Sequence, residues 1–338
     1  MSSWAKKVLL VACILPQTIQ ALSSVAVPTA PNPLQDFDLA TNKKLPWLQN
    51  GYQTWKWRNH DINYIEMGDP SKPAIVLIHG FGASAYHWRY NIPDLAKDYH
   101  VFAYCKLGFG LSSKPVQEYA AEVWRDQAVD FLKEVVQKPA VLAGNSLGGF
   151  TSLYAAATDE AKSMVNGVIL LNGAGRFRDN TQVEEKETNP IVESIQKFIQ
   201  RLVIGASFVI TKQPARIAQI LRQVYPINAD MVDEELVESI RYPSLDPNAA
   251  EVFYRVISKN GNGPSVYVDD LLKNLECPLL LCWGEYDPWI RPQAADRVQA
   301  IYPAAQRVSI DAGHCPHDEA PEAVNEAIRN FVETTSRN

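Results

Sequence analysis

Short apolar runs recur along the chain, separated by longer segments in which apolar residues follow helical spacing. A continuous apolar run of about five residues is typical of a strand buried on both faces of a sheet. The runs lie at residues 62–67, 74–79, 101–104, 139–143, 168–171, 278–283 and 307–310. The segment Val123 to Val136, by contrast, has the period of an amphipathic helix. Strands that alternate with helices predict a mostly parallel sheet with helices on both faces.

The pattern changes between residues 175 and 266, where the apolar residues have helical spacing and no strand-like alternation. We expect this stretch to be a helical cap, inserted between two parts of one core at residues 51–174 and 267–338. Its run Leu202 to Ile210 suggests membrane contact. A buried cap helix explains the run as well, and the run is far too short to span a bilayer.

A serine-containing turn, Gly144-Asn145-Ser146-Leu147-Gly148, follows one apolar run and precedes a helix-like run. In that context a Gly-x-Ser-x-Gly turn predicts a nucleophile elbow, which holds the serine in a strained backbone conformation with its Oγ exposed. Side chains at positions 144 and 148 would collide, so glycine is needed at both. Taken alone, the turn could equally be a Gly–Ser turn that caps a helix.

A serine hydroxyl needs a base that removes its proton and an acid that orients the base. The expected acid is Asp287 and the expected base is His314, each in a loop that follows a predicted strand. Catalytic groups gather at the carboxyl ends of strands in such sheets, and the chain order Ser146, Asp287, His314 fits this architecture. Glu285 is the rival acid and His317 is the rival base.

The oxyanion of an acyl-transfer intermediate needs two aligned N–H donors. One is expected from the backbone of Leu147, the residue after the nucleophile. The other is expected from Phe81, in the loop His79-Gly80-Phe81-Gly82 after an early strand. Glycine on both sides of Phe81 lets this loop approach a substrate carbonyl closely. Alone, the loop could be an ordinary strand–helix turn.

The stretch His314 to Asp318 also contains residue types that bind metals. A zinc site would need further ligands at recognisable spacing, and the sequence offers none. We therefore expect no metal and no cofactor. His317, Asp318 and Glu319 are expected to cap and fix the loop that leads into a helix at Pro321.

Several stretches resemble the α/β-hydrolases of plastids and cyanobacteria, among them the chlorophyll-dephytylating group that contains pheophytinase. The matching stretches are 55–58, 77–84, 87–93, 144–150, 219–225, 287–289 and 313–321. The most specific of them is Gly-His-Cys-Pro-His-Asp-Glu, from Gly313 to Glu319. The resemblance covers nearly everything from Trp55 to the C-terminus. It implies an α/β-hydrolase fold, a serine esterase activity and a helical cap, but it does not identify the ester.

The loop after the third apolar run departs from these relatives. They usually carry Asp-Leu-Leu-Gly-Phe-Gly where this chain has Cys105-Lys106-Leu107-Gly108-Phe109-Gly110. The change removes a polar anchor near the sheet edge but no member of the triad. It therefore bears on how this loop packs and on the choice of substrate.

The first functional hypothesis is a serine carboxylic-ester hydrolase that acts on a small lipophilic ester, such as a phytylated plastid pigment. Apolar residues of the predicted cap, Phe198 and Phe208 among them, would supply an apolar pocket. An epoxide hydrolase or a dehalogenase would have aspartate at position 146. A cofactor-free perhydrolase or haloperoxidase shares the triad and stays an alternative, as does a catalytically inactive ligand-binding protein on the same scaffold.

Composition and the N-terminus bear on partners and compartment. The 338 residues are 46% hydrophobic and 21% charged, as in ordinary soluble proteins, and the net charge of −6 argues against a nucleic-acid partner. Lys6 and Lys7 precede a short apolar run, which predicts a signal-peptide-like leader over residues 1–21. Residues 22–50 resemble the transit-like segment of algae with complex plastids, or else form a linker after plain secretion. We expect no transmembrane span and at most a peripheral contact with plastid membranes.

Five cysteines are present, and Cys13 lies in the predicted leader. The other four, Cys105, Cys277, Cys282 and Cys315, have the spacing of neither a disulfide framework nor a zinc site. We expect them to be free, buried thiols. Free thiols indicate a reducing compartment, which favours a plastid over the extracellular space.

Overall fold

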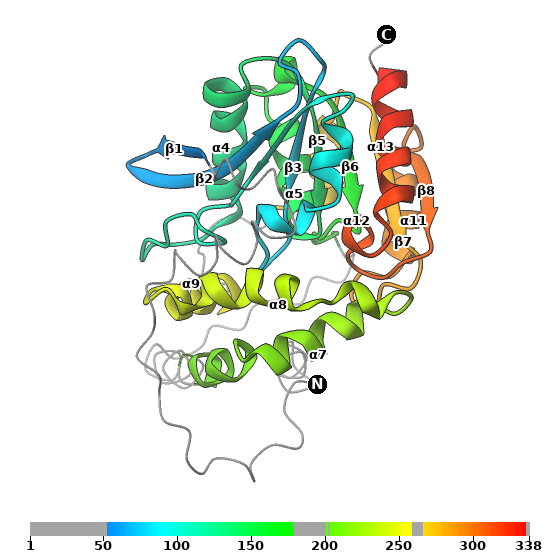
Figure 1. Cartoon of the computed structure of the whole chain (residues 1–338). Helices are drawn as coiled ribbons and strands as arrows, with labels where there is room; N and C mark the ends of the chain where they lie inside the picture. The colour runs from blue at the N-terminus through cyan, green and yellow to red at the C-terminus, as the bar shows by residue number, and fades with distance from the viewer. Residues whose placement is uncertain (1–52, 179–200, 202, 259–265, 336–338) are drawn as a thin grey trace, which may run out of the picture.

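The seven predicted strands and one further strand, β1, form an eight-stranded sheet with the order β1-β2-β4-β3-β5-β6-β7-β8 (Figure 1). Strand β2 is antiparallel to β1 and β4, and the other neighbouring pairs are parallel. The strands are Gln53–Trp57 (β1), His60–Met67 (β2), Ala74–Ile78 (β3), His100–Tyr104 (β4), Ala140–Asn145 (β5), Val165–Leu171 (β6), Leu279–Gly284 (β7) and Gln306–Ile310 (β8). This computed structural model describes residues 53–178, 201, 203–258 and 266–335. The predicted leader and the segment up to residue 50 lie outside the described residues.

Strand β1 is the one strand in this sheet that the apolar pattern does not predict. Its burial comes from Trp55 and Trp57, with polar residues beside them. The turn into β2 consists of Arg58 and Asn59, which have φ angles of 47° and 66°. Two left-handed residues form the turn that suits the twist of a two-residue β-hairpin. The hairpin therefore forms because of its turn and its two indoles, and not because of a long apolar run.

Side chains of the central strands alternate between two apolar cores, one on each face of the sheet. In β3, Val76 and Ile78 belong to the core that includes α4, α5, α10 and α11, whereas Ile75 and Leu77 belong to the core that includes α3 and α13. The helices are Asn91–Leu95 (α3), Ala121–Phe131 (α4), Leu147–Ala156 (α5), Val268–Asn274 (α10), Gln293–Ile301 (α11) and Pro321–Thr335 (α13). The predicted layered architecture, a mostly parallel sheet between helices, is confirmed.

Three of the helices between β6 and β7 lie along one side of the molecule (Figure 1). They are Pro214–Val224 (α7), Glu234–Arg241 (α8) and Ala249–Ser258 (α9). Helices α7 and α8 share an apolar cluster of their own, which also includes Cys315. Arg176 and Tyr267, close to the two ends of the predicted insertion, form an isolated parallel bridge. The division into a core and a cap at residues 175–266 stays a prediction.

Residues 203–211 are helical, as the sequence predicts for this part of the chain. The side chains of Ile204 and Phe208 are buried, while those of Val203, Val209 and Ile210 are exposed. The helix is therefore buried on one face and exposed on the other, and its place in a cap stays a prediction. Among the described residues, no helix has the length and apolar character needed to cross a membrane.

Candidate active site

Ser146 occupies the sharp turn between β5 and α5. Its φ of 52° and ψ of −117° are strained for a residue with a side chain, which confirms the predicted conformation. The backbone holds this strain in place, because Ser146 N–H donates to the carbonyl of Leu171 over 3.0 Å. The Ser146 carbonyl in turn accepts from the N–H groups of Phe150 and Ala174. Ser146 as a whole residue is half-buried.

The two glycines of the turn leave no space for a side chain. A Cβ added to Gly144 would lie 2.3 Å from the carbonyl carbon of Gly148. A Cβ added to Gly148 would lie 2.0 Å from the carbonyl oxygen of Ile78, at the end of β3. The predicted collision is therefore real, and it also involves the neighbouring strand. Glycine at these positions lets α5 start directly over the ends of β3 and β5.

The loop after β3 lies beside Ser146. A Cβ added to Gly80 would lie 3.4 Å from Ser146 Cβ. The next residue, Phe81, and Leu147, the first residue of α5, carry the two N–H groups predicted for the oxyanion. Within the described part of the chain, neither N–H donates to a protein acceptor. The first N–H groups of a helix carry partial positive charge, which suits an anion at this place.

His314 and Asp287 are hydrogen-bonded through a 2.7 Å contact between His314 Nδ1 and Asp287 Oδ2. Both side chains are almost completely buried. The other carboxylate oxygen, Oδ1, accepts from the N–H groups of Trp289 and Ile290. The carboxylate is therefore fixed on both of its oxygens, and it can hold the imidazole with Nδ1 protonated and Nε2 free to accept a proton.

Asn172 also holds Asp287, although the sequence pattern did not predict this role. Its Nδ2 donates to Asp287 Oδ2 over 2.8 Å, and its Oδ1 accepts from the N–H of Gly284 at the end of β7. The side chain is fully buried and the backbone is left-handed, with φ at 47°. Its place directly after a predicted strand was the available signal, because side chains at carboxyl strand ends converge on such sites.

Asn145 connects the serine side of the site to the histidine side. Its Nδ2 donates to the carbonyl of His314 over 2.8 Å, and the adjacent residue is Ser146. The N–H of His314 donates to the carbonyl of Val224, the last residue of α7. The structure thus brings the serine and histidine loops together. Between the described residues there is no hydrogen bond from Ser146 Oγ to the imidazole of His314.

The two rival residues contact other parts of the molecule. Glu285 accepts hydrogen bonds from Ser309 and Arg307 on the edge strand β8. The ring of His317 lies 4.2 Å from that of Trp88 between ring centroids and is fully buried, with no hydrogen-bond partner for either nitrogen. Burial also lowers the pKa of His317 well below its ordinary value. Among the described residues, neither of them is hydrogen-bonded to Ser146 or to His314.

The predicted loop-fixing residues in α12 (Pro316–Glu319) act in three different ways. Glu319 does fix the histidine loop: it accepts from the N–H of Gly313 and, through its other oxygen, from the N–H groups of Ile227 and Asn228. The prediction is wrong for His317, which makes no hydrogen bond through its ring. Asp318 instead forms a buried ion pair with Arg89, the residue that follows the short helix Ala85–Trp88.

That ion pair joins Asp318 to Arg89, whose Nε lies 2.8 Å from Asp318 Oδ1. Arg89 also contacts Asp233, ahead of α8, and Tyr225 donates its hydroxyl to Asp318. Burial alone would lower the pKa of Arg89, but the two carboxylates raise it above its ordinary value. Burial lowers the pKa of His87, which is hydrogen-bonded to Tyr225, to about 4. This buried network attaches α8 and the end of α7 to the histidine loop.

The four cysteines outside the predicted leader are free, as predicted. Three of them are buried, and Cys277 is half-buried. Burial raises the pKa of Cys282 to about 12 and that of Cys277 to about 11. These thiols are therefore protonated and weakly reactive near neutral pH. In the part of the chain that the structure describes, no cluster of His, Cys, Asp or Glu could hold a metal ion.

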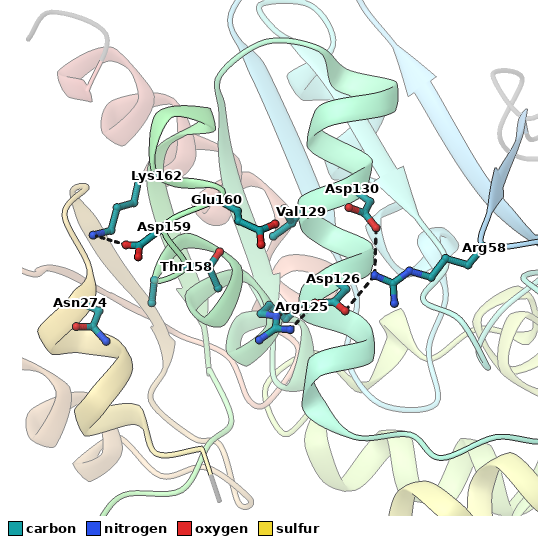
Figure 2. Close-up of a pocket in the computed structure, with 11 residues that line it drawn as sticks. Arg58, Arg125, Asp126, Val129, Asp130, Thr158, Asp159, Glu160, Lys162 and Asn274 are labelled. Atoms are coloured by element: carbon teal, nitrogen blue, oxygen red, sulfur yellow. Dashed lines mark hydrogen bonds and ion pairs between the residues drawn. The ribbon is translucent and has the colours of Figure 1, made fainter. Parts of the chain in front are cut away.

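An open cleft of about 590 Å³ lies at the opposite end of α5 from Ser146 (Figure 2). Its charged residues form ion pairs with one another: Arg58 with Asp126 and Asp130, and Lys162 with Asp159. All of these groups are partly exposed to solvent. The cleft therefore offers paired charges and no activated nucleophile, and the candidate active site lies at the carboxyl ends of the strands instead.

Comparison with known proteins gives three kinds of match. The profile of the Alpha/beta hydrolase family matches residues 75–327. The chloroplastic pheophytinase of Arabidopsis thaliana is 29% identical over 93% of this chain and 71% of its own, and epoxide hydrolase 3 of Xenopus tropicalis is 24% identical over 84% and 78%. Among solved structures, a bacterial membrane phospholipase A matches with a TM-score of 0.69 and 24% identity, covering 90% of this chain and 93% of its own. An esterase from Thermogutta terrifontis matches with a TM-score of 0.65 and 20% identity, over 84% and 98%.

Proposed function

Because this chain belongs to the alpha/beta hydrolase family and is a hydrolase, we propose that it is a serine carboxylic-ester hydrolase with Ser146 as nucleophile. His314 is the general base and Asp287 orients it. One observation carries the proposal. Asn145, which directly precedes the strained Ser146, donates a hydrogen bond to the backbone carbonyl of His314. His314 is in turn hydrogen-bonded to Asp287.

In the proposed reaction, Ser146 Oγ attacks the ester carbonyl while His314 Nε2 accepts the hydroxyl proton. The carbonyl oxygen becomes an oxyanion and receives hydrogen bonds from the N–H groups of Phe81 and Leu147. Collapse of this intermediate breaks the ester C–O bond, and His314 returns the proton to the leaving alcohol. Water then hydrolyses the acyl-enzyme by the same steps. The contact between Ser146 and His314 tightens when substrate binds, as is common for catalytic hydrogen bonds that are open without substrate.

The substrate is proposed to be a lipophilic ester, in the class of phytylated plastid pigments. Aromatic rings lead from the oxyanion loop toward the predicted cap: Phe81 lies 5.8 Å from Phe253, and Phe253 lies 5.0 Å from Phe208, measured between ring centroids. These rings offer apolar surface next to the reacting group. The match to a chloroplastic pheophytinase supports the same class of substrate, a plastid location and peripheral contact with plastid membranes.

Epoxide hydrolases are also among the relatives, but their chemistry would need a carboxylate at position 146. Serine there forms an acyl-enzyme with an ester and cannot form the alkyl-ester intermediate of an aspartate nucleophile. The proposal therefore places this chain with the esterases and lipases among its relatives.

The test is the variant Ser146→Ala, assayed with a p-nitrophenyl ester and with the phytyl ester of a chlorophyll-derived pigment. We expect kcat to fall by at least about 1000-fold with both esters, because the nucleophile is gone. The matched control is Ser163→Ala, which removes an exposed hydroxyl on a short turn and should leave kcat unchanged. Near-normal turnover by a folded Ser146→Ala protein would disprove the assignment. Tight lipid binding without hydrolysis by the wild type would favour an inactive ligand-binding protein.

A further inference from the structure

The imidazole of His79, directly after β3, is enclosed between two backbone groups. Its Nδ1 lies 2.7 Å from the carbonyl oxygen of Gly80, and its Nε2 accepts from the N–H of Lys106 over 3.0 Å. The side chain is fully buried. His79 belongs to neither the proposed triad nor the pair of oxyanion donors, so it has no role in the reaction steps proposed for Ser146 and His314.

These two contacts determine which nitrogen of His79 carries the proton. A backbone N–H can only donate, so Nε2 must present its lone pair to Lys106. In a neutral imidazole the proton is then on Nδ1, which donates to Gly80 O. Burial lowers the pKa of His79 well below its ordinary value, so the ring stays neutral near neutral pH.

The Gly80 carbonyl and the Phe81 N–H belong to one trans peptide, in which the C=O and N–H bonds point in opposite directions. Holding the oxygen against His79 therefore turns the Phe81 N–H away from the imidazole. The peptide lies beside the nucleophile, because a Cβ added to Gly80 would be 3.4 Å from Ser146 Cβ. The N–H so presented has no acceptor within the described residues.

We propose that His79 is a positioning residue for the oxyanion: its Nδ1–H holds the Gly80–Phe81 peptide in the orientation that offers the Phe81 N–H to the substrate carbonyl. The inference rests on the proposed function, since acyl transfer is the reaction that needs this donor. If the peptide rotated by half a turn, the Gly80 oxygen would replace the donor. An oxygen at that place would repel the charge that develops on the substrate.

A purely structural role for His79 would depend on a different contact of the ring. The imidazole also lies 6.0 Å from the ring of Phe109 and receives the N–H of Lys106. If His79 only anchored the loop at 105–110, the contact through Nε2 would be the one that matters. The proposal instead depends on the contact through Nδ1, and substitutions can separate the two.

The experiment compares His79→Asn, His79→Gln and His79→Leu in the full chain, with p-nitrophenyl butyrate as substrate. Asparagine can place its amide N–H near the position of Nδ1, while the longer glutamine side chain reaches the position of Nε2. We expect His79→Asn to keep kcat within about fivefold of the wild type. His79→Gln and His79→Leu should lower kcat by about 100-fold with little change in KM, the effect of losing one oxyanion donor.

Two further measurements do not depend on turnover by the variants. The dissociation constant of a trifluoromethyl ketone, which forms an oxyanion adduct with Ser146, should rise in parallel with the loss of kcat when it is measured by direct binding. The ¹⁵N chemical shifts of the wild-type ring should show a protonated Nδ1 and an unprotonated Nε2. The shifts decide the case even where a variant fails to fold, because a proton on Nε2 would overturn the inference.

The outcomes separate this inference from the proposed function. A folded His79→Leu protein with kcat within about threefold of the wild type would overturn the role of His79 and leave the esterase intact. If His79→Gln kept kcat near the wild-type value and His79→Asn did not, the positioning role would also be overturned, and the structural role through Nε2 would be supported. Absence of hydrolysis that depends on Ser146 in the wild type would overturn both.

Discussion

The serine side and the histidine side of the site are held by different kinds of contact. Backbone groups locate Ser146, through the hydrogen bond from its N–H to Leu171 and the close approach of Gly148 to β3. The histidine side also has a backbone contact, from the N–H of His314 to the carbonyl of Val224, but it depends in addition on side chains that come from separate stretches of the chain. They are Asn145, Asn172, Asp287 and Glu319.

The two halves of the site are therefore sensitive to different substitutions. A serine located by backbone contacts needs only a few residues in the right order, and the sheet that carries it also maintains its strain. A histidine located by side chains can lose its position, its tautomer or its partner through one substitution. We therefore expect the largest losses from single polar substitutions on the histidine side.

The largest effect is expected from Asp287→Asn, on the histidine side. The amide keeps the size of the carboxylate but donates where the carboxylate accepted from His314 Nδ1–H, so the imidazole is held in the wrong tautomer. We expect kcat to fall by about 10⁴-fold, measured with a p-nitrophenyl ester, while Ser146 keeps its strained backbone.

The matched control for that prediction is Glu285→Gln, two residues earlier in the same loop. Glu285 contacts Ser309 and Arg307 and does not touch His314, so its loss should change kcat by about twofold at most. The reverse order of effects would identify Glu285 as the acid and would remove Asp287 from the proposed triad.

The serine side could be predicted from the sequence because its causes are local. The turn 144–148 contains both glycines that its geometry requires, and the apolar run before it identifies the strand. The parallel sheet was predictable for the same reason, since its strands are continuous apolar runs buried on both faces. Strand β1 was not predicted because it has no such apolar run and forms through two tryptophans and the left-handed turn Arg58-Asn59.

The supports of the histidine side could not be predicted, because they join residues that are distant in the sequence. Asn172 is 115 residues from its partner Asp287, and Arg89 is 229 residues from Asp318. A single sequence shows that such residues are polar, but it does not show that they are buried or with which residue they pair. Their identities followed only from the packing of the helices onto the sheet.

The next test, Arg89→Met, acts on the buried network behind the histidine loop. Methionine keeps much of the length of the side chain but leaves Asp318, whose side chain is fully buried, without its counter-charge. Removing one partner of a buried ion pair costs about 3–5 kcal/mol in the free energy of unfolding, measured by urea denaturation. A loss below about 1 kcal/mol would show that other groups hold this side and would weaken the contrast with the serine side.

The smallest effect is expected from the same substitution at an exposed ion pair, Arg58→Met. Arg58 lies 3.1 Å from Asp126 and 3.5 Å from Asp130 across the charged cleft, with 55% of its side chain exposed. Solvent screens such pairs and already hydrates both carboxylates, so the loss in the free energy of unfolding should be below about 1 kcal/mol. The urea denaturation used for Arg89→Met measures both variants on one scale. If Arg58→Met were as destabilising as Arg89→Met, burial would not be what makes the histidine side sensitive, and the contrast between backbone and side-chain support would need another cause.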